Sequence, residues 1–147
     1  MPSVSRSETV VLDASVAVRW VIAEEGSEEA AALLDREVSW IAPGLLLTEV
    51  AAALRRKTAE GDLEANIAGQ ALDTLLQAIA DGVVHLADDE RTIAHALALA
   101  LSLEHKLPDC VYLALAERDG AALATADARL ARLASHRGVT VLRVPHA

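Results

Sequence analysis

The sequence predicts a three-layer α/β/α fold around a mostly parallel central sheet of about five strands. Short apolar runs alternate with amphipathic segments along the chain, and no internal repeat or long linker interrupts the alternation. Strands that alternate with helices form a parallel sheet with helices on both faces. At 147 residues the chain fits one domain, which we expect to span residues 1–147 with residues 1–8 as a flexible N-terminal extension.

Five segments have the length and apolar content of buried strands. The first runs from Thr9 to Asp13 and is rich in β-branched residues, which favour strands. Pro43 and Gly44 stop the second, and a turn at residues 81–82 precedes the third. The expected strands cover residues 9–13, 38–42, 83–86, 121–125 and 139–144.

Helical segments fill the intervals between these strands. Ser27 is expected to cap one of them, and Pro108 starts another because proline is tolerated at the first helical position. His95 and His105 are expected on a single helix that begins at Asp88 or Asp89 and runs to about residue 104. The other expected helices cover residues 27–37, 45–59, 62–80, 108–119 and 128–136.

Cysteine content and hydropathy narrow the possible classes of protein. The single cysteine, Cys110, excludes an internal disulfide and a cysteine-rich zinc site, and it is typical of a reducing cytosol. The N-terminal segment lacks the apolar stretch of a signal peptide. The longest helical stretch without Asp, Glu, Lys or Arg, at 92–103, has 12 residues, whereas a membrane span needs roughly 18. We therefore expect a cytoplasmic protein.

Four of the 22 acidic residues stand in apolar surroundings: Asp13 after the first strand, Glu49 within a helix, Asp109 in a helix start and Asp127 after the fourth strand. A carboxylate in such surroundings is costly unless it is paired or bound to a metal. Asp13, Asp109 and Asp127 each stand where a helix begins, so each alone is equally well explained as a helix cap. Glu49 lies inside its helix, where capping does not apply. Pairing through space with a cationic side chain is a further alternative for the set.

Topology brings two of these acids together. Asp13 and Asp127 follow strands that become neighbours in a doubly wound sheet, at the edge where ligands bind. Carboxylates gathered there repel one another unless some are protonated or a cation binds. Oxygen ligands suit Mg²⁺ or Mn²⁺ better than zinc, and a hard metal held by carboxylates is typical of phosphoryl-group hydrolysis.

Four short motifs carry a resemblance to a known family. They are Val-Leu-Asp-Ala-Ser at 11–15, Pro-Gly-Leu-Leu-Leu-Thr-Glu-Val at 43–50, Leu-Pro-Asp-Cys-Val-Tyr-Leu-Ala-Leu-Ala at 107–116 and Ala-Thr-Ala-Asp-Ala-Arg-Leu at 124–130. Each motif is weak alone, but all four occur in order and at family-like spacing. The chain thereby resembles the PIN-domain nucleases, and among them the VapC-type toxin ribonucleases of type II toxin–antitoxin systems.

The resemblance implies a metal-dependent endoribonuclease with an antitoxin protein as partner, and a homodimer. Asp13, Glu49, Asp109 and Asp127 match the acidic quartet that binds Mg²⁺ or Mn²⁺ in the family, and none of them is substituted. A metal-activated water would attack the phosphodiester of an RNA substrate. Ser15 and Thr125 match hydroxyl positions that orient the carboxylates, although each hydroxyl is equally well explained as a partner of nearby backbone at a helix start.

The net charge of −9 has the wrong sign for a nucleic-acid ligand, because phosphate contacts supply most of the affinity. Bound metal would cancel part of the local negative field, and a positive patch needs only to be local. The densest basic cluster is Arg55, Arg56 and Lys57, for which a solvated helix end is the alternative to substrate contact. Three more cations are placed to flank the site: Arg19, Arg129 and Arg132.

Other functions remain as alternatives. A Rossmann-like phosphatase also places an Asp after the first strand but requires a second Asp two positions later, where this chain has Ser15. A response-regulator receiver requires a lysine late in the chain, and the last lysine here is Lys106. A non-catalytic module whose acidic pocket receives a basic segment of a partner protein belongs to a different class.

The remaining reactive side chains are expected to be structural. The five histidines show no metal-ligand spacing, and His85 falls on an expected strand. Cys110 precedes core-like Ala114 by one helical turn, so we expect it to be buried. Tyr112 lies one turn after Asp109 and is expected to pack in the core, with a place at the border of the site as the alternative.

Overall fold

The central sheet has five strands in the order β3–β2–β1–β4–β5, and every neighbouring pair is parallel. The computed structural model describes residues 8–87 and 89–145 of the chain. Its strands are β1 (Glu8–Leu12), β2 (Val38–Ala42), β3 (Val84–Leu86), β4 (Ala122–Thr125) and β5 (Val141–Arg143). Each strand begins and ends within two residues of the range expected from the sequence.

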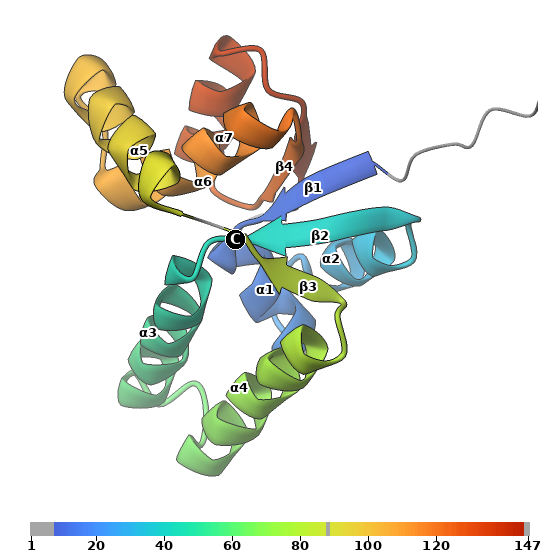
Figure 1. Cartoon of the computed structure of the whole chain (residues 1–147). Helices are drawn as coiled ribbons and strands as arrows, with labels where there is room; N and C mark the ends of the chain where they lie inside the picture. Colours follow the sequence, from blue (N-terminus) through green and yellow to red (C-terminus); the bar gives the residue numbers. More distant parts are fainter. Residues whose placement is uncertain (1–7, 88, 146–147) are drawn as a thin grey trace, which may run out of the picture.

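Seven helices in the described part of the chain cover the sheet on both faces. Figure 1 shows α1 to α4 on one side of the sheet and α5 to α7 on the other, which confirms the expected three-layer architecture. None of these helices has the length and apolarity that crossing a membrane requires. The helices are α1 (Ala14–Val21), α2 (Ser27–Leu34), α3 (Leu45–Ala59), α4 (Ala65–Ala80), α5 (Glu90–Leu103), α6 (Leu107–Asp119) and α7 (Ala128–His136).

The core centres on β1 and α6. β1 lies in the middle of the sheet, and its last three residues, Val10 to Leu12, are fully buried. On α6 all residues from Cys110 to Ala116 are buried, because this helix packs between the sheet and α5. On the other face, the rings of Trp20 and Trp40 meet edge to face at 5.0 Å and join α1 to β2. A core rich in Ala, Leu and Val thus holds β1 rigidly beneath the site described below.

One helix start and one helix cap differ from the expectation. α4 begins at Ala65 rather than at Asp62, because Gly61 adopts a positive φ of 83° and the Asp62 amide turns back to the Lys57 carbonyl. Ser27 does not cap α2, so that expectation was wrong. Its hydroxyl instead accepts a hydrogen bond from the Glu24 amide at 2.9 Å and donates one to a carbonyl in the preceding loop at 3.0 Å. Ser27 therefore closes the loop between α1 and α2.

Helix α5 is capped at its start and ends earlier than expected. Asp89 is the cap and accepts a hydrogen bond from the Thr92 amide at 3.0 Å, while Asp88, the other expected start, lies outside the described residues. Glu104 adopts a left-handed conformation with φ of 51° and ends the helix. His105 therefore lies in the loop before α6 and does not share a helix with His95, contrary to the expectation. Of the expected N-terminal extension, Glu8 is the first residue of β1 and residues 1–7 lie outside the described part.

Candidate active site

A pocket of about 770 Å³ opens at the carboxyl edge of the sheet, above the boundary between β1 and β4. The strand order reverses at this boundary, which is where open α/β sheets bind ligands. All four acids expected from the sequence line the pocket: Asp13, Glu49, Asp109 and Asp127. Five cationic residues also line the pocket: Arg19, Arg56, Lys57, Arg129 and Arg143.

Asp13 is the most buried acid of the pocket, with 6 % of its surface exposed. It follows β1 directly and stands at the cap position of α1, but its side chain does not cap that helix. Its Oδ2 accepts hydrogen bonds from the Ser15 hydroxyl at 2.5 Å and the Thr125 hydroxyl at 2.8 Å. Burial raises the pKa of Asp13 to about 6 against the lowering effect of these two hydroxyls, and the charges of Glu49 and Asp109 raise it further.

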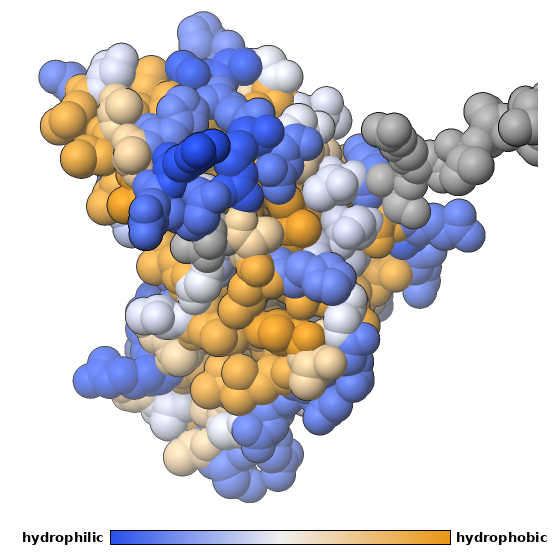
Figure 2. All heavy atoms as spheres, viewed as in Figure 1, coloured by the Kyte–Doolittle hydropathy of each residue, from blue (hydrophilic) through white to orange (hydrophobic). Residues whose placement is uncertain are grey.

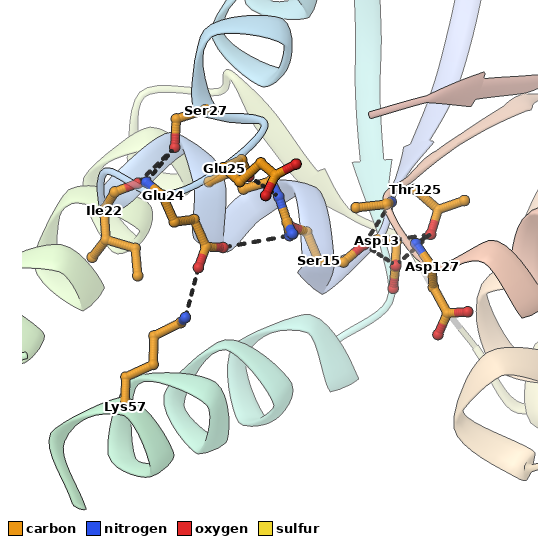
Figure 3. A network of polar contacts seen from close by, with 11 residues as sticks. Asp13, Ser15, Ile22, Glu24, Glu25, Ser27, Lys57, Thr125 and Asp127 are labelled. Carbon is orange, nitrogen blue, oxygen red and sulfur yellow. Dashed lines mark hydrogen bonds and ion pairs between the residues drawn. The ribbon is translucent and has the colours of Figure 1, made fainter. Parts of the chain in front are cut away.

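The two hydroxyls also serve the backbone of the turn that carries Asp127. The Ser15 hydroxyl accepts a hydrogen bond from the Ala126 amide at 2.9 Å, and the Thr125 hydroxyl accepts one from the Asp127 amide at 3.0 Å. Figure 3 shows this network joining α1 to the end of β4. Each hydroxyl therefore both bonds the Asp13 carboxylate and satisfies local backbone, so the two alternatives considered from the sequence coexist.

Glu49 is half-buried in the middle of α3 and faces the same pocket. Burial raises its pKa, the nearby Tyr112 hydroxyl lowers it, and the charge of Asp109 raises it. Asp13, Glu49 and Asp109 come from three different elements and act on one another electrostatically. The charge of Asp109 raises the pKa of both Asp13 and Glu49, so these acids repel one another within the pocket.

Asp109 in the first turn of α6 has a partner that the sequence did not reveal. Its Oδ2 lies 2.8 Å from Nε2 of His105, and both side chains are about one-fifth exposed. The spacing of four residues suggested no such contact, because His105 was expected on the preceding helix. The left-handed turn at Glu104 brings the imidazole to the carboxylate.

Asp127 caps α7. Its Oδ1 accepts hydrogen bonds from the Arg129 amide at 2.8 Å and the Leu130 amide at 3.1 Å. The capping alternative thus holds for this acid, whereas Asp13 makes no capping bond and Glu49 lies inside its helix. Because the cap uses Oδ1, the other carboxylate oxygen of Asp127 is left to face the pocket that this residue lines.

The donor set and the charge of the pocket fit a divalent cation. The four acids supply only oxygen ligands, which Mg²⁺ and Mn²⁺ prefer, and their repulsion is the kind that a bound cation relieves. The buried hydroxyl of Tyr112, beside Glu49, has no hydrogen-bond partner among the described residues. Within residues 8–87 and 89–145, no three His, Cys, Asp or Glu side chains stand close enough to ligate one ion as they are. A bound ion would therefore require side-chain rotation.

The basic residues of the pocket differ in how firmly they are held. Lys57 on α3 pairs with Glu24 at 2.6 Å, and Arg19 contacts the same carboxylate at 3.4 Å (Figure 3). Arg19 is buried and donates to the carbonyls of Ser15 at 2.6 Å and Glu25 at 2.8 Å, so it braces α1 rather than offering a free charge.

Among the other cations considered from the sequence, Arg56 and Arg129 line the pocket and Arg55 and Arg132 do not. Arg143 on β5 also lines it and was not singled out from the sequence. The local sequence around Arg143 does not indicate a place in the site, because only the pairing of β4 with β5 brings this residue near the acids.

The chain is a doubly wound α/β/α domain, a class that binds ligands at the switch point of its sheet, and acids and cations line that place here. The family model of the PIN domain matches residues 10–135, and the chain belongs to this family. PIN domains are generally nucleases. No curated protein matches the sequence.

Solved structures share the fold at low sequence identity. PAE2754 from Pyrobaculum aerophilum is 21 % identical with a TM-score of 0.67, over 92 % of this chain and 89 % of that one. VapBC2 from Rickettsia felis, bound to a DNA fragment from its promoter, is 13 % identical with a TM-score of 0.65, over 92 % and 98 %. FitAcB from Neisseria gonorrhoeae is 16 % identical with a TM-score of 0.58, over 91 % and 96 %.

Proposed function

We propose that this chain is a divalent-metal-dependent endoribonuclease and the toxin of a toxin–antitoxin pair. The observation that carries the proposal is the convergence of Asp13, Glu49 and Asp109 in a pocket that cationic side chains also line, where burial and neighbouring carboxylates raise the pKa of Asp13 and Glu49. Acids that repel one another suit a bound cation, and cationic side chains in the same pocket suit a phosphate backbone.

Asp13, Glu49, Asp109 and Asp127 would hold Mg²⁺ or Mn²⁺. When bound, such an ion supplies an activated water as nucleophile and neutralises charge that develops on the phosphodiester. The hydroxyls of Ser15 and Thr125 keep Asp13 oriented, since both donate to its Oδ2.

The cationic wall would bind the RNA backbone. Arg56, Arg129 and Arg143 line the same pocket as the acids, so phosphates near the cleaved bond would meet positive charge there, and Lys57 would join them by giving up its ion pair with Glu24. The described residues offer no row of exposed aromatic rings on which bases stack, since Trp40 and Tyr112 are buried and Trp20 is half-buried. Selection of the RNA would therefore depend on its shape.

An antitoxin partner is suggested by two of the structural neighbours, VapBC2 and FitAcB, which are toxin–antitoxin assemblies. The pocket offers a place for such a partner, because an acidic cavity attracts a basic protein segment. A segment seated there would exclude RNA and metal together. We place this inhibited complex in the cytoplasm.

A homodimer is supported by the outer face of α5. Ile93, Leu97 and Leu101 follow one another at four-residue spacing, and their exposed fractions are 46, 51 and 72 %. Figure 2 shows apolar side chains gathered over this helix. A helix face that is apolar and exposed in the monomer is typical of a contact between subunits.

The test of the proposed function is cleavage of RNA by the purified protein in Mn²⁺ and in EDTA. We expect cleavage in Mn²⁺ only, and we expect Asp13→Asn to abolish it. Asp73→Asn is the matched control, because it removes an equal charge from an exposed site on α4 outside the pocket.

Cleavage that survives EDTA and Asp13→Asn would contradict the metal mechanism. Absence of cleavage with any divalent metal, together with binding of a basic peptide that Asp13→Asn weakens, would favour the non-catalytic binding module. Cleavage of a DNA strand of the same sequence at an equal rate would contradict specificity for RNA.

A further inference from the structure

The hydroxyl of Tyr112 is buried without a hydrogen-bond partner. Tyr112 is the single tyrosine of the chain, lies on α6 and is fully buried. Among the described residues its hydroxyl is the one buried side-chain polar atom that lacks a partner. A hydroxyl removed from water without a partner destabilises the fold, whereas phenylalanine in the same place would not. Because this hydroxyl does not stabilise the fold, its presence is better explained by a role in function.

The surroundings of this hydroxyl connect it to the acidic pocket. Asp109, which lines the pocket, stands on the same helix one turn earlier, so the two residues share one face of α6, with Tyr112 buried below it. The hydroxyl lies near the Glu49 carboxylate and the Ala14 amide without reaching hydrogen-bond geometry with either. It is thus placed to donate to Glu49 after a small rotation.

At this position the Tyr112 hydroxyl can act only as a hydrogen-bond donor. Burial raises the pKa of Tyr112 far above its usual value, and the charges of Asp13 and Glu49 add to the effect. The hydroxyl therefore stays protonated and can donate to a carboxylate.

We propose that Tyr112 is a positioning residue whose hydroxyl donates a hydrogen bond to Glu49 when Glu49 turns to hold a divalent cation with Asp13 and Asp109. The inference rests on the proposed metal site. A carboxylate that ligates a metal through one oxygen is held in place by a donor to its other oxygen. Tyr112 reaches Glu49 from beneath the pocket, so it orients this acid without touching the RNA.

The test compares Tyr112→Phe with wild type by calorimetric titration with Mn²⁺ and by thermal unfolding without metal. We expect Tyr112→Phe to weaken Mn²⁺ binding about 10- to 100-fold, the usual effect of losing a group that orients a metal ligand. We expect its unfolding midpoint to stay equal or rise, because the variant removes an unpartnered hydroxyl.

Thr92→Val is the matched control. Thr92 is 1 % exposed and lies at the start of α5, outside the pocket, and its hydroxyl accepts a hydrogen bond from Arg118 at 2.6 Å. Loss of this bonded hydroxyl should lower the unfolding midpoint and leave Mn²⁺ affinity unchanged, which is the reverse of the result expected for Tyr112→Phe.

A single tyrosine also gives a single spectroscopic signal. In protein labelled with ¹³C at the tyrosine ζ-carbon, Mg²⁺ should shift the one resonance as the hydroxyl begins to donate. Glu49→Gln should reduce that shift. Wild-type Mn²⁺ affinity in Tyr112→Phe, or an unmoved resonance in metal-saturated wild type, overturns the role of Tyr112 alone. Failure of wild type to bind any divalent metal overturns the proposed metal site and this inference together.

Discussion

At the scale of one residue, the buried carboxylate of Asp13 lowers the stability of the folded protein. The carboxylate is almost fully buried at the end of the central strand, and two hydroxyls hold it in place. Those hydrogen bonds favour its charged form, but burial outweighs them and raises its pKa to about 6. At neutral pH the folded chain therefore carries a buried charge that Ser15 and Thr125 only partly compensate.

The first prediction concerns the pH dependence of stability without metal. An acid whose pKa is about 6 in the folded state and near 3.8 in the unfolded state keeps its proton in the folded state alone between those values. Stability from this group is thus full below about pH 4 and is lost as pH rises toward 6. Asp13→Asn removes the loss, and we expect it to raise the unfolding free energy at pH 7 by up to about 3 kcal/mol.

Urea unfolding of wild type and Asp13→Asn at several pH values checks this expectation. The advantage of the variant should shrink as the pH falls from 7 and vanish near pH 4. A variant that is less stable than wild type at pH 7 would contradict the assignment of a buried charge to Asp13.

The second prediction separates the two roles of Asp127. Because its Oδ1 caps α7 through two backbone amides, Asp127→Ala should lower the unfolding free energy by about 1 kcal/mol. Asp127→Asn keeps an oxygen for the cap and should retain most of that stability, while RNA cleavage falls in both variants. Chemical denaturation and the cleavage assay measure the two effects. Cleavage that persists in Asp127→Asn at the wild-type rate would leave Asp127 with capping alone.

At the scale of elements, α6 organises both the core and the site. Seven consecutive residues of this helix, 110–116, are buried, yet the same helix carries Asp109 and Tyr112 toward the pocket. A helix buried on nearly all sides is fixed in rotation by its packing, so its polar side chains are held where the site needs them. Helix α5 covers α6 on one side and leaves its own outer face apolar and exposed.

The third prediction concerns that outer face of α5. Leu97→Glu places a charge at its centre, and we expect it to convert a dimer into a monomer without changing the unfolding midpoint of the monomer. Sedimentation velocity measures the state of both proteins. Leu34→Glu on α2, where the leucine is 40 % exposed, should leave the dimer intact. A wild-type protein that is monomeric at micromolar concentration would remove this role from α5.

Alternation of apolar runs and turns predicted most of these elements, because helices and strands have different hydrophobic periods. It also indicated the four acids, because carboxylates in apolar surroundings are unusual at any position. Local sequence did not indicate the left-handed turn at Glu104, so the contact of His105 with Asp109 was missed. The place of Arg143 in the pocket depends on the pairing of β5 with β4, which no local pattern encodes.

The whole molecule carries a net charge of −9, yet cationic side chains from α3, α7 and β5 line one pocket together with the acids. A local group of cations would let an acidic protein bind the proposed RNA substrate there while the rest of its surface repels it. The doubly wound topology creates this arrangement, because the strand order reverses between β1 and β4. Side chains from both halves of the chain therefore meet at one edge of the sheet. The central claim is that the four acids of this pocket form a site for a divalent metal.

The most direct test is thermal unfolding at pH 7 with and without Mn²⁺, for wild type, Asp13→Asn and the surface control Asp73→Asn. Ligand at about 100 times its dissociation constant stabilises a protein by about 2.7 kcal/mol. We predict that Mn²⁺ raises the midpoints of wild type and Asp73→Asn and leaves that of Asp13→Asn nearly unchanged. An equal response in all three proteins, or none in wild type, would contradict the claim.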